Sequence, residues 1–252
     1  MKQLERHHKI LQLLSEQGFV STEDLVSHFT VSPQTIRRDL NELADQKRIQ
    51  RHHGGASLQT STENDPYANR KVAFQESKQR IASAIAEQIP NGASLFIDIG
   101  TTAEAVALAL LNHKALRVVT NNLNVASILL KNEDVMVILA GGEVRHRDGG
   151  IIGEATRDFI NQFRMDFGIL GISGIDEDGS LLDFDYHEVR VKQSIIDHSR
   201  HAFLAADVSK FGRNAMVNMG NIAQVNALFT DAQPPRGIRN ILEQNHVQCH
   251  IC

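Results

Sequence analysis

Cysteine is nearly absent from this 252-residue chain, and both copies lie at its C-terminal end. Cys249 and Cys252 are too close together there to cross-link the fold, so no structural disulfide is expected. Long apolar runs are also missing, since no stretch approaches the ~18 apolar residues of a membrane span. The opening segment, MKQLERHHKI, has charged residues and no apolar signal core. A cytoplasmic protein with no membrane partner is therefore expected.

Several motifs of nucleotide and metal chemistry are missing as well. The chain has no G-x-x-x-x-G-K-[ST] sequence, which excludes the common phosphate-binding loop. The spacing of Gly168, Gly171 and Gly174 also differs from the dinucleotide-binding fingerprint. His187 and Glu188 begin a zinc-protease motif, but position 191 is Val, so the second metal ligand is missing. No metal site and no cofactor are expected.

Charge is distributed unevenly along the chain. The formal net charge is −4, which by itself argues against a nucleic-acid partner. Residues 1–58, however, carry eight Lys and Arg, seven Asp and Glu, and five of the twelve His, whereas the remainder has a net charge of −5. The N-terminal segment is thus the only part of the chain that phosphate does not repel on average.

Three helical patterns with short gaps occupy this N-terminal segment. Apolar residues at helical spacing predict a first helix over residues 3–17. Ser21 is a good N-cap for a second helix, in which Leu25 marks the buried side. Ser32 can cap a third helix, because Pro33 suits its first position. Three short helices with this spacing are typical of a helix-turn-helix unit.

The third helix is amphipathic, with hydrogen-bonding groups and two adjacent arginines in its N-terminal half. Ile36 and Leu40 fall on the buried face, and Ser32 begins the helix. In helix-turn-helix domains this half enters the major groove, where Arg pairs with guanine and Gln with adenine. The polar side and its flanks contain Gln34, Thr35, Arg37, Arg38 and Asn41.

The segment RIQRHHGGA after this helix predicts a two-stranded wing. Ile49 alternates with polar neighbours, and Gly54–Gly55 permits a tight turn. A small protein-binding domain with a solvated helix and a glycine turn is the alternative. The three capped helices, the wing and the charge asymmetry together favour DNA binding. The wing residues available to phosphates are Arg48, Arg51, His52 and His53.

The remaining sequence predicts a linker and a second domain. Residues 58–74 are mostly polar, which is typical of a linker between domains. Beyond them, short β-rich runs alternate with helices, which predicts an α/β domain with a largely parallel sheet and helices on both faces. The expected organisation is a winged helix-turn-helix domain over 1–57, a linker over 58–74 and an effector-sensing domain over 75–252.

Small, hydroxyl and amide side chains follow the predicted strands of this second domain. Ligands of parallel sheets bind at the C-terminal ends of the strands, so these groups are expected to share one pocket. Gly100 precedes a helix whose N-terminal N–H groups suit an anion. A phosphorylated polyol or sugar fits best, with Lys210 supplying charge and Asp98 binding hydroxyls. The strand ends are 98–102, 120–122, 141–143, 171–176 and 207–211.

These segments together resemble the DeoR-type family of bacterial transcriptional repressors. VSPQTIRRDLNELA and RHHGGA are similar to the family's DNA-binding segment, whereas FIDIGTT, VVTNNLNVA, LAGGE, FGILGISGID and SKFGRNAM are similar to its effector domain. The resemblance covers essentially the whole chain. It implies a sensor fold related to ribose-5-phosphate isomerase and CoA-transferase, and a repressor that leaves operator DNA when a phosphorylated effector binds.

The resemblance also implies partners and site residues. DGGIIGEATRDFI and DYHEVR point to sn-glycerol 3-phosphate as effector, to control of glycerol metabolism genes, and to a homo-oligomer, either dimer or tetramer. Many relatives have Gly after the recognition helix, whereas this chain has ADQKRIQR, so its wing contacts are expected to differ. The implied DNA-reading residues are Ser32, Gln34, Thr35, Arg37 and Arg38. The implied effector-binding residues are Asp98, Gly100, Thr101, Thr102, Asn121, Gly142, Ser173 and Lys210.

Two other functions stay open at this point. A sugar-phosphate isomerase or deaminase with an added DNA-binding domain would draw general acid–base chemistry from carboxylates. Those carboxylates equally suit hydroxyl binding or helix capping, and the N-terminal domain favours a sensor without catalytic residues. An activator differs from a repressor only in where its operator lies. The candidate carboxylates are Glu143, Asp176, Asp183, Asp185 and Glu188.

Overall fold

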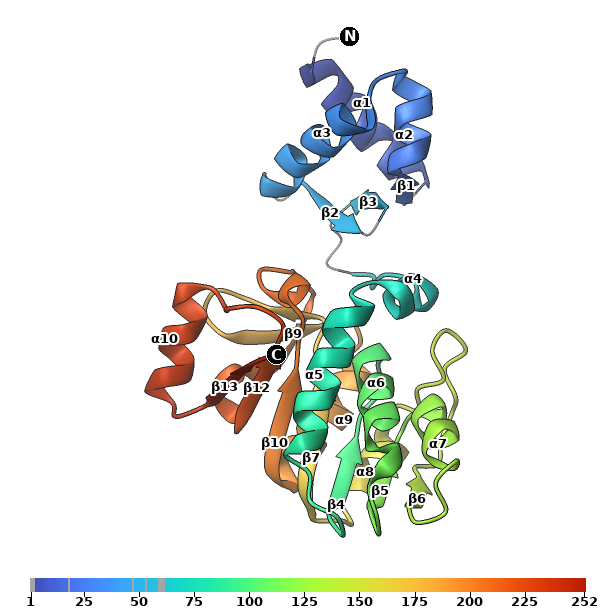
Figure 1. The fold of residues 1–252 in the computed structure, drawn as a ribbon, viewed down its shortest axis with the longest axis vertical. Coiled ribbons are helices and arrows are strands. Elements are labelled where there is room, and N and C mark those ends of the chain that lie inside the picture. The colour runs from blue at the N-terminus through green and yellow to red at the C-terminus, as the bar shows by residue number, and fades with distance from the viewer. Residues whose placement is uncertain (1–2, 18, 47, 53, 59–61) are drawn as a thin grey trace. The chain divides into compact units, whose positions relative to one another are not determined.

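The computed structural model describes residues 3–17, 19–46, 48–52, 54–58 and 62–252. The chain forms two compact units, Met1–Thr60 and Ser61–Cys252, here called unit 1 and unit 2. Figure 1 shows the elements of both. Among the described residues no helix combines the length and apolar character that crossing a membrane requires.

Unit 1 consists of three helices and a small antiparallel sheet. The first helix begins and ends as expected, and the serine caps form. Ser21 Oγ accepts a hydrogen bond from the Asp24 N–H (3.0 Å), and Ser32 Oγ accepts one from the Thr35 N–H (3.2 Å). The elements are α1 (Gln3–Gln17), β1 (Phe19–Ser21), α2 (Thr22–Phe29), α3 (Pro33–Asp45), β2 (Ile49–His52) and β3 (Gly55–Leu58).

The wing sheet has a third strand that the sequence analysis did not predict. β3 lies between β1 and β2, and it pairs with both in antiparallel fashion. Gly55 permits the pairing with β1, since an added Cβ would lie 2.5 Å from the carbonyl oxygen of Val20. Behind the sheet, buried residues from all three helices form one core. Its members are Ile10, Leu14, Val20, Leu25, Ile36, Leu40, Leu43, Ile49 and Ala56.

Unit 2 is built on a seven-stranded parallel sheet, as the sequence predicts. The strand order is β13-β12-β10-β7-β4-β5-β6, and every pairing is parallel. The strands are β4 (Ser94–Ile97), β5 (Arg117–Thr120), β6 (Met136–Leu139), β7 (Met165–Gly171), β10 (Ser199–Ala205), β12 (Ala227–Thr230) and β13 (Gln248–Ile251). A smaller antiparallel sheet joins β8 (Gly174–Ile175), β9 (Ser180–Asp183) and β11 (Val217–Asn221).

Helices cover both faces of the large sheet (Figure 1). Alternate strand residues point to opposite faces, so Leu95 and Ile97 belong to one core cluster and Phe96 to the other. One face is covered by α5 (Gln75–Glu87), α6 (Thr101–Ala109) and α7 (Leu123–Leu129). The other is covered by α8 (Glu154–Ile160), α9 (Tyr186–Asp197) and α10 (Arg236–Gln244).

The segment interpreted as a linker is more structured than its composition indicates. Residues Tyr67–Val72 form a helix, α4, and side chains of this segment contact the rest of unit 2. The Tyr67 hydroxyl donates to the Glu104 carboxylate (2.9 Å), and Arg213 donates to the Asp65 carboxylate (2.9 Å). These partners lie far away in sequence, which is why a local reading of a polar stretch does not find them. The polar stretch therefore contains a helix and is hydrogen-bonded to the rest of unit 2 at both Asp65 and Tyr67.

Candidate DNA-binding surface and effector site

The third helix exposes the side that the sequence assigns to DNA. Ile36 and Leu40 are fully buried behind it, whereas Gln34 and Arg37 are exposed. The Arg38 side chain is 78% exposed, and its Nε lies 3.2 Å from the Glu42 carboxylate. Neither guanidinium is tucked into the core. The helix is anchored from its apolar side and presents polar groups to solvent.

Asp39 fixes this helix to α1, an interaction that the sequence analysis missed. It is 1% exposed, and its carboxylate accepts hydrogen bonds from Arg6 Nε and from Arg6 Nη2 (2.9 Å). His7 Nε2 lies 3.1 Å from the same carboxylate. Burial alone would raise the pKa of Asp39, but the Arg6 hydrogen bond and charge, with His7, hold it below its usual value. The ion pair sets the orientation of the recognition helix in unit 1.

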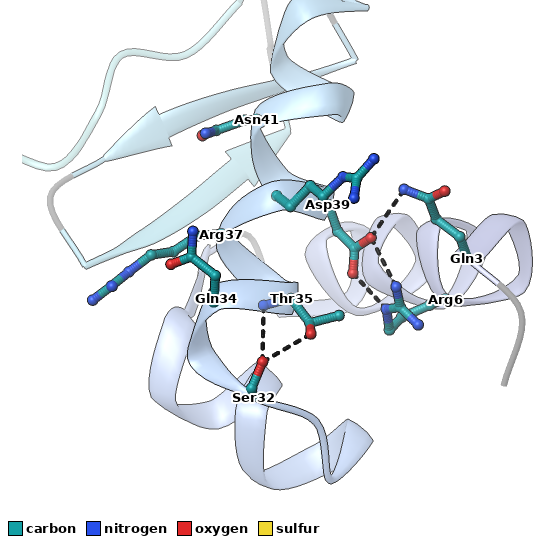
Figure 2. Close-up of a pocket in the computed structure, with 9 residues that line it drawn as sticks. Gln3, Arg6, Ser32, Gln34, Thr35, Arg37, Asp39 and Asn41 are labelled. Carbon is teal, nitrogen blue, oxygen red and sulfur yellow. Dashed lines mark hydrogen bonds and ion pairs between the residues drawn. The ribbon is translucent and has the colours of Figure 1, made fainter.

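A groove follows this helix on its exposed side (Figure 2). Its walls come from the start of α1 and the N-terminal half of α3. In Figure 2, Ser32 and Thr35 lie together at the start of α3, and their hydroxyl oxygens are 2.8 Å apart. The lining residues are Gln3, Arg6, Ser32, Gln34, Thr35, Arg37, Arg38, Asp39 and Asn41.

The wing residues differ in their availability. Arg48 is exposed, whereas Arg51 and His52 are half-buried. Burial lowers the pKa of Arg51, and the nearby charge of Arg37 lowers it further. His52 Nε2 lies 2.7 Å from the Ser57 hydroxyl, so this ring is already engaged within the sheet. The prediction for His53 lies outside the described residues.

The expected effector residue Asp98 belongs to a buried ionic cluster in unit 2. Lys192 of α9 is the centre of this Lys192 cluster. Its Nζ lies 3.2 Å from Asp98, 3.1 Å from Asp183 and 3.0 Å from Glu188. It also donates a hydrogen bond to the Gly171 carbonyl (2.9 Å). One ammonium group thus joins the ends of β4, β7 and β9 to α9.

The charges in this cluster are set by competing effects. Burial raises the pKa of Asp98 to about 6, and the Lys192 charge opposes that rise. Burial would lower the pKa of Lys192, but its three carboxylates raise it well above the usual value. Glu188 has a lowered pKa, because Lys192 and Arg145 outweigh its burial. The Lys192 ammonium therefore stays protonated, and it is surrounded by three carboxyl groups.

A second set of charges lies beside residues 62–73, a segment here called the strap. The cation cluster consists of Arg70, Lys78, Lys210 and Arg213. Lys78 Nζ donates to the carbonyls of Arg70 and Ala73, the latter at 2.7 Å. Burial lowers the pKa of Lys78 to about 8, and the charge of Lys210 lowers it further. Burial lowers the pKa values of Lys210 and Arg213 as well, and the charge of Arg70 lowers the pKa of all three other cations further.

Three other predicted effector residues connect to these two clusters. Ser173 Oγ donates to the Asp183 carboxylate (2.8 Å), which places it at the Lys192 cluster. Thr101 Oγ1 donates to the Arg70 carbonyl (3.4 Å) at the start of α6. Lys210 Nζ lies 3.8 Å from the Asp207 carboxylate, and its side chain is only 18% exposed. The sequence therefore locates the end of the sheet at which both clusters form.

The other predicted residues serve backbone geometry or lie apart. Gly100 has φ +131° and caps α6, and a Cβ there would meet no atom within 4 Å. Thr102 is buried in the first turn of that helix. The Asn121 amide donates to the Ile151 carbonyl (3.0 Å). Gly142, with φ +150°, lies beside the Ile151 side chain. None of the described contacts joins Asn121 or Gly142 to either cluster.

Several charged residues at this end of the sheet have no clear signal in the sequence. Arg145 is the clearest, since it lies 2.8 Å from Asp148, 3.0 Å from Asp185 and 2.9 Å from Glu188. Lys192 had a detectable signal, because it follows Glu188 by four positions on a helix, the spacing of an ion pair. Arg145 had none, because its partners Asp185 and Glu188 are distant in the chain.

Comparison with known families agrees with both halves of this arrangement. The profile described as "DeoR-like helix-turn-helix domain" matches residues 6–62, and the profile described as "DeoR C terminal sensor domain" matches residues 73–232. The chain belongs to the DeoR family. The "Glycerol-3-phosphate regulon repressor" of Escherichia coli strain K12 is 66% identical over 252 residues, which is 100% of both chains. This DeoR-family protein is thus a DNA-binding transcriptional repressor and not an enzyme, as the sequence predicts.

Solved structures resemble the fold at low identity. eIF2B beta from Chaetomium thermophilum is 12% identical with a TM-score of 0.50, over 86% of this chain and 62% of that chain. Ribose 5-phosphate isomerase A from Neisseria gonorrhoeae is 16% identical with a TM-score of 0.40, over 53% of this chain and 52% of the other. The expected α/β architecture is confirmed by the parallel sheet of unit 2 and by the match to the sensor-domain profile.

Proposed function

We propose that this repressor binds operator DNA through α3 and releases it when sn-glycerol 3-phosphate occupies unit 2. The supporting observation is the full-length identity of 66% with a glycerol-3-phosphate regulon repressor. We assign DNA binding to residues 1–57 and effector sensing to residues 75–252, connected by residues 58–74. The regulated genes would serve glycerol metabolism. Cytoplasmic localisation belongs to the same proposal.

The DNA-binding step uses the exposed side of α3. Gln34 and Arg38 project from a helix whose opposite side is packed into unit 1. Such a helix inserts its N-terminal half into the major groove. Arg37 and Arg48 add positive charge for phosphates. Asp39 does not touch DNA in this proposal, because its carboxylate already holds Arg6.

The effector would lie between the two charged clusters, which differ in sign. The cation cluster suits the phosphate group, since a dianion gains most where several buried cations meet. The Lys192 cluster is rich in carboxylates, which accept hydrogen bonds from hydroxyl groups. A small polyol with phosphate at one end matches that polarity in one orientation. Thr101, at the N-terminus of α6, would add a hydroxyl and backbone N–H groups to the phosphate side.

Release requires only that the effector prefer a form that binds DNA poorly. We propose a homo-oligomer that presents two recognition helices to the half-sites of an operator. An effector that binds the non-operator arrangement more tightly shifts the population toward it. Couplings of about 1–3 kcal/mol are typical, and they weaken operator binding by about 5–150-fold.

Two variants test the two steps separately. Arg38→Ala should weaken operator binding and lower the slope of log affinity against log salt by about 0.9, the value of one phosphate contact. Fluorescence anisotropy with DNA from upstream of the glycerol-phosphate genes measures both quantities. Arg164→Ala, an exposed arginine of unit 2, is the matched control. If Arg38→Ala bound the operator with unchanged affinity, α3 would not be the element that contacts DNA.

Lys210→Ala should leave operator affinity unchanged and make release insensitive to sn-glycerol 3-phosphate. The control is Lys131→Ala, an exposed lysine at the end of α7. A thermal-shift titration tests effector binding directly, since a ligand at 100 times its Kd adds about 2.7 kcal/mol of stability. Normal release in Lys210→Ala would show that the effector binds elsewhere. Enzymatic turnover of phosphorylated sugars by the wild-type protein would contradict a sensor.

A further inference from the structure

The strap, residues 62–73, is held by hydrogen bonds to helices of unit 2. The Tyr67 hydroxyl contacts both oxygens of the Glu104 carboxylate at 2.9 Å. Asn124 Nδ2 donates to the Tyr67 hydroxyl (3.2 Å). Lys78 of α5 holds the other end of the strap through the Ala73 carbonyl (2.7 Å). Residues from three helices of unit 2 therefore hold the segment that leads to unit 1.

Arg213 joins the strap to the site at a single guanidinium group. Its Nη2 donates to the Asp65 carboxylate and to the Asn64 side-chain oxygen, both at 2.9 Å, and its Nη1 donates to the Ser173 carbonyl (3.2 Å). The side chain is 5% exposed, and the guanidinium lies over the Phe184 ring at 5.1 Å. Its buried Nε has no hydrogen-bond partner among the described residues. This group is fixed in place and keeps one donor unused.

A phosphate monoester would compete with Asp65 for this guanidinium. It carries a charge of about −1.5 to −2 and three strong acceptor oxygens, whereas the Asp65 carboxylate carries one charge. Arginine binds such oxygens in pairs, and the unused Nε together with a terminal nitrogen offers that geometry. Lys210 is electrostatically coupled to both Arg213 and Asp65, so its charge also favours an anion here.

We propose that the Asp65–Arg213 ion pair is a latch that the effector phosphate opens, which rests on the proposed function above. The phosphate takes Arg213 from Asp65, and the strap loses one of the contacts that hold it to the rest of unit 2. Thr62 follows Leu58, the last residue of β3, by four positions, so the strap is the stretch of chain that leads directly into unit 1. With this attachment lost, the N-terminal end of the strap positions that stretch less firmly, and operator binding weakens. By linkage, the closed latch opposes effector binding to the same extent.

Asp65→Asn tests the latch, because it removes the competing charge and keeps a side chain of the same size. The variant should bind sn-glycerol 3-phosphate at least about fivefold more tightly than wild type, the lower end of typical coupling. Its operator affinity without effector should fall by a similar factor. Glu63→Gln, an exposed carboxylate on the same strap, is the matched control and should change neither quantity. Calorimetry and fluorescence anisotropy on the full chain measure the two affinities.

Unchanged or weaker effector binding in Asp65→Asn would overturn the latch, since the carboxylate would then not compete. A wild-type protein that binds operator DNA but does not respond to sn-glycerol 3-phosphate would instead overturn the proposed function. Hydrogen–deuterium exchange of wild type gives a second test that needs no variant. Exchange at residues 62–73 should rise when sn-glycerol 3-phosphate is added and should not change with glycerol. A fall would overturn the latch, because the strap would then close over the ligand as a lid.

Discussion

The pH dependence of the free energy of unfolding tests the Lys192 cluster through Asp98. Its side chain is fully buried, and burial raises its pKa to about 6 even with Lys192 at 3.2 Å. In an unfolded chain the pKa of Asp is about 3.9. Because the folded pKa is the higher one, the folded state binds this proton more tightly than the unfolded state does. The stabilising contribution is complete below about pH 4 and is lost as the pH rises through about 6.

The size of the effect follows from the two pKa values. A shift of about 2 units corresponds to about 3 kcal/mol over the whole titration. Between pH 7 and pH 5 the group recovers about 1.3 kcal/mol of that stability. Asp98→Asn cannot titrate, so the variant loses this dependence. The free energy of unfolding of wild type minus that of the variant should therefore be about 1.3 kcal/mol more favourable to wild type at pH 5 than at pH 7.

Urea denaturation followed by tyrosine fluorescence measures this difference in the right part of the chain. The protein has no Trp and two Tyr, and both Tyr67 and Tyr186 lie in unit 2. Asp158→Asn serves as control, since that side chain is 63% exposed. A difference between wild type and Asp98→Asn that is the same at pH 5 and pH 7 would refute the reasoning. It would mean that Lys192 keeps Asp98 ionised throughout this range.

Two further predictions concern unit 1. Asp39→Ala leaves Arg6 buried beside a missing partner, which costs about 3–5 kcal/mol for an enclosed pair; calorimetry should show an earlier unit 1 transition and an unchanged unit 2 transition, and coincident shifts of both would contradict a local role. Gly55→Ala places a methyl group 2.5 Å from the Val20 carbonyl oxygen, so it should lower unit 1 stability by about 1–3 kcal/mol; no loss in the same calorimetric experiment would mean that β1 does not pair with β3 in solution.

The features that the sequence predicts correctly are local ones. Ser21 and Ser32 each cap the helix that follows by accepting a hydrogen bond from the N–H group three positions downstream. Each cap therefore depends only on residues that are neighbours in the sequence. Ile36 and Leu40 repeat at helical spacing, so the buried face of α3 is visible in the sequence. The ends of the parallel strands are also visible locally, because Gly100 and Thr101 follow the last residue of β4 by only three and four positions. Local patterns therefore locate both the amphipathic helix α3 and the edge of the sheet where the charged clusters form.

The features that the sequence does not reveal depend on partners far away in the chain. In the sequence, Asp39 resembles any other polar residue on a solvent-exposed helix. Only the fold brings it into contact with Arg6, which is 33 positions away. The strap reads as a polar linker, because its partner Arg213 is 148 positions from Asp65. Such pairs leave no periodic signal. The closest thing to a sequence signal for such a pair is a charged residue among apolar ones, such as Lys192 near Val191 and Ile195.

The energetics of the latch match the size of regulation that a repressor needs. Exposed ion pairs contribute about 0–1 kcal/mol, and removing one partner of a buried pair costs about 3–5 kcal/mol. The Asp65–Arg213 pair lies between these cases, with side chains 16% and 5% exposed. Its loss therefore falls in the range of about 1–3 kcal/mol that typical allosteric coupling requires. Under the latch proposal, opening this ion pair changes operator affinity without refolding of either unit, because the strap is covalently continuous with unit 1.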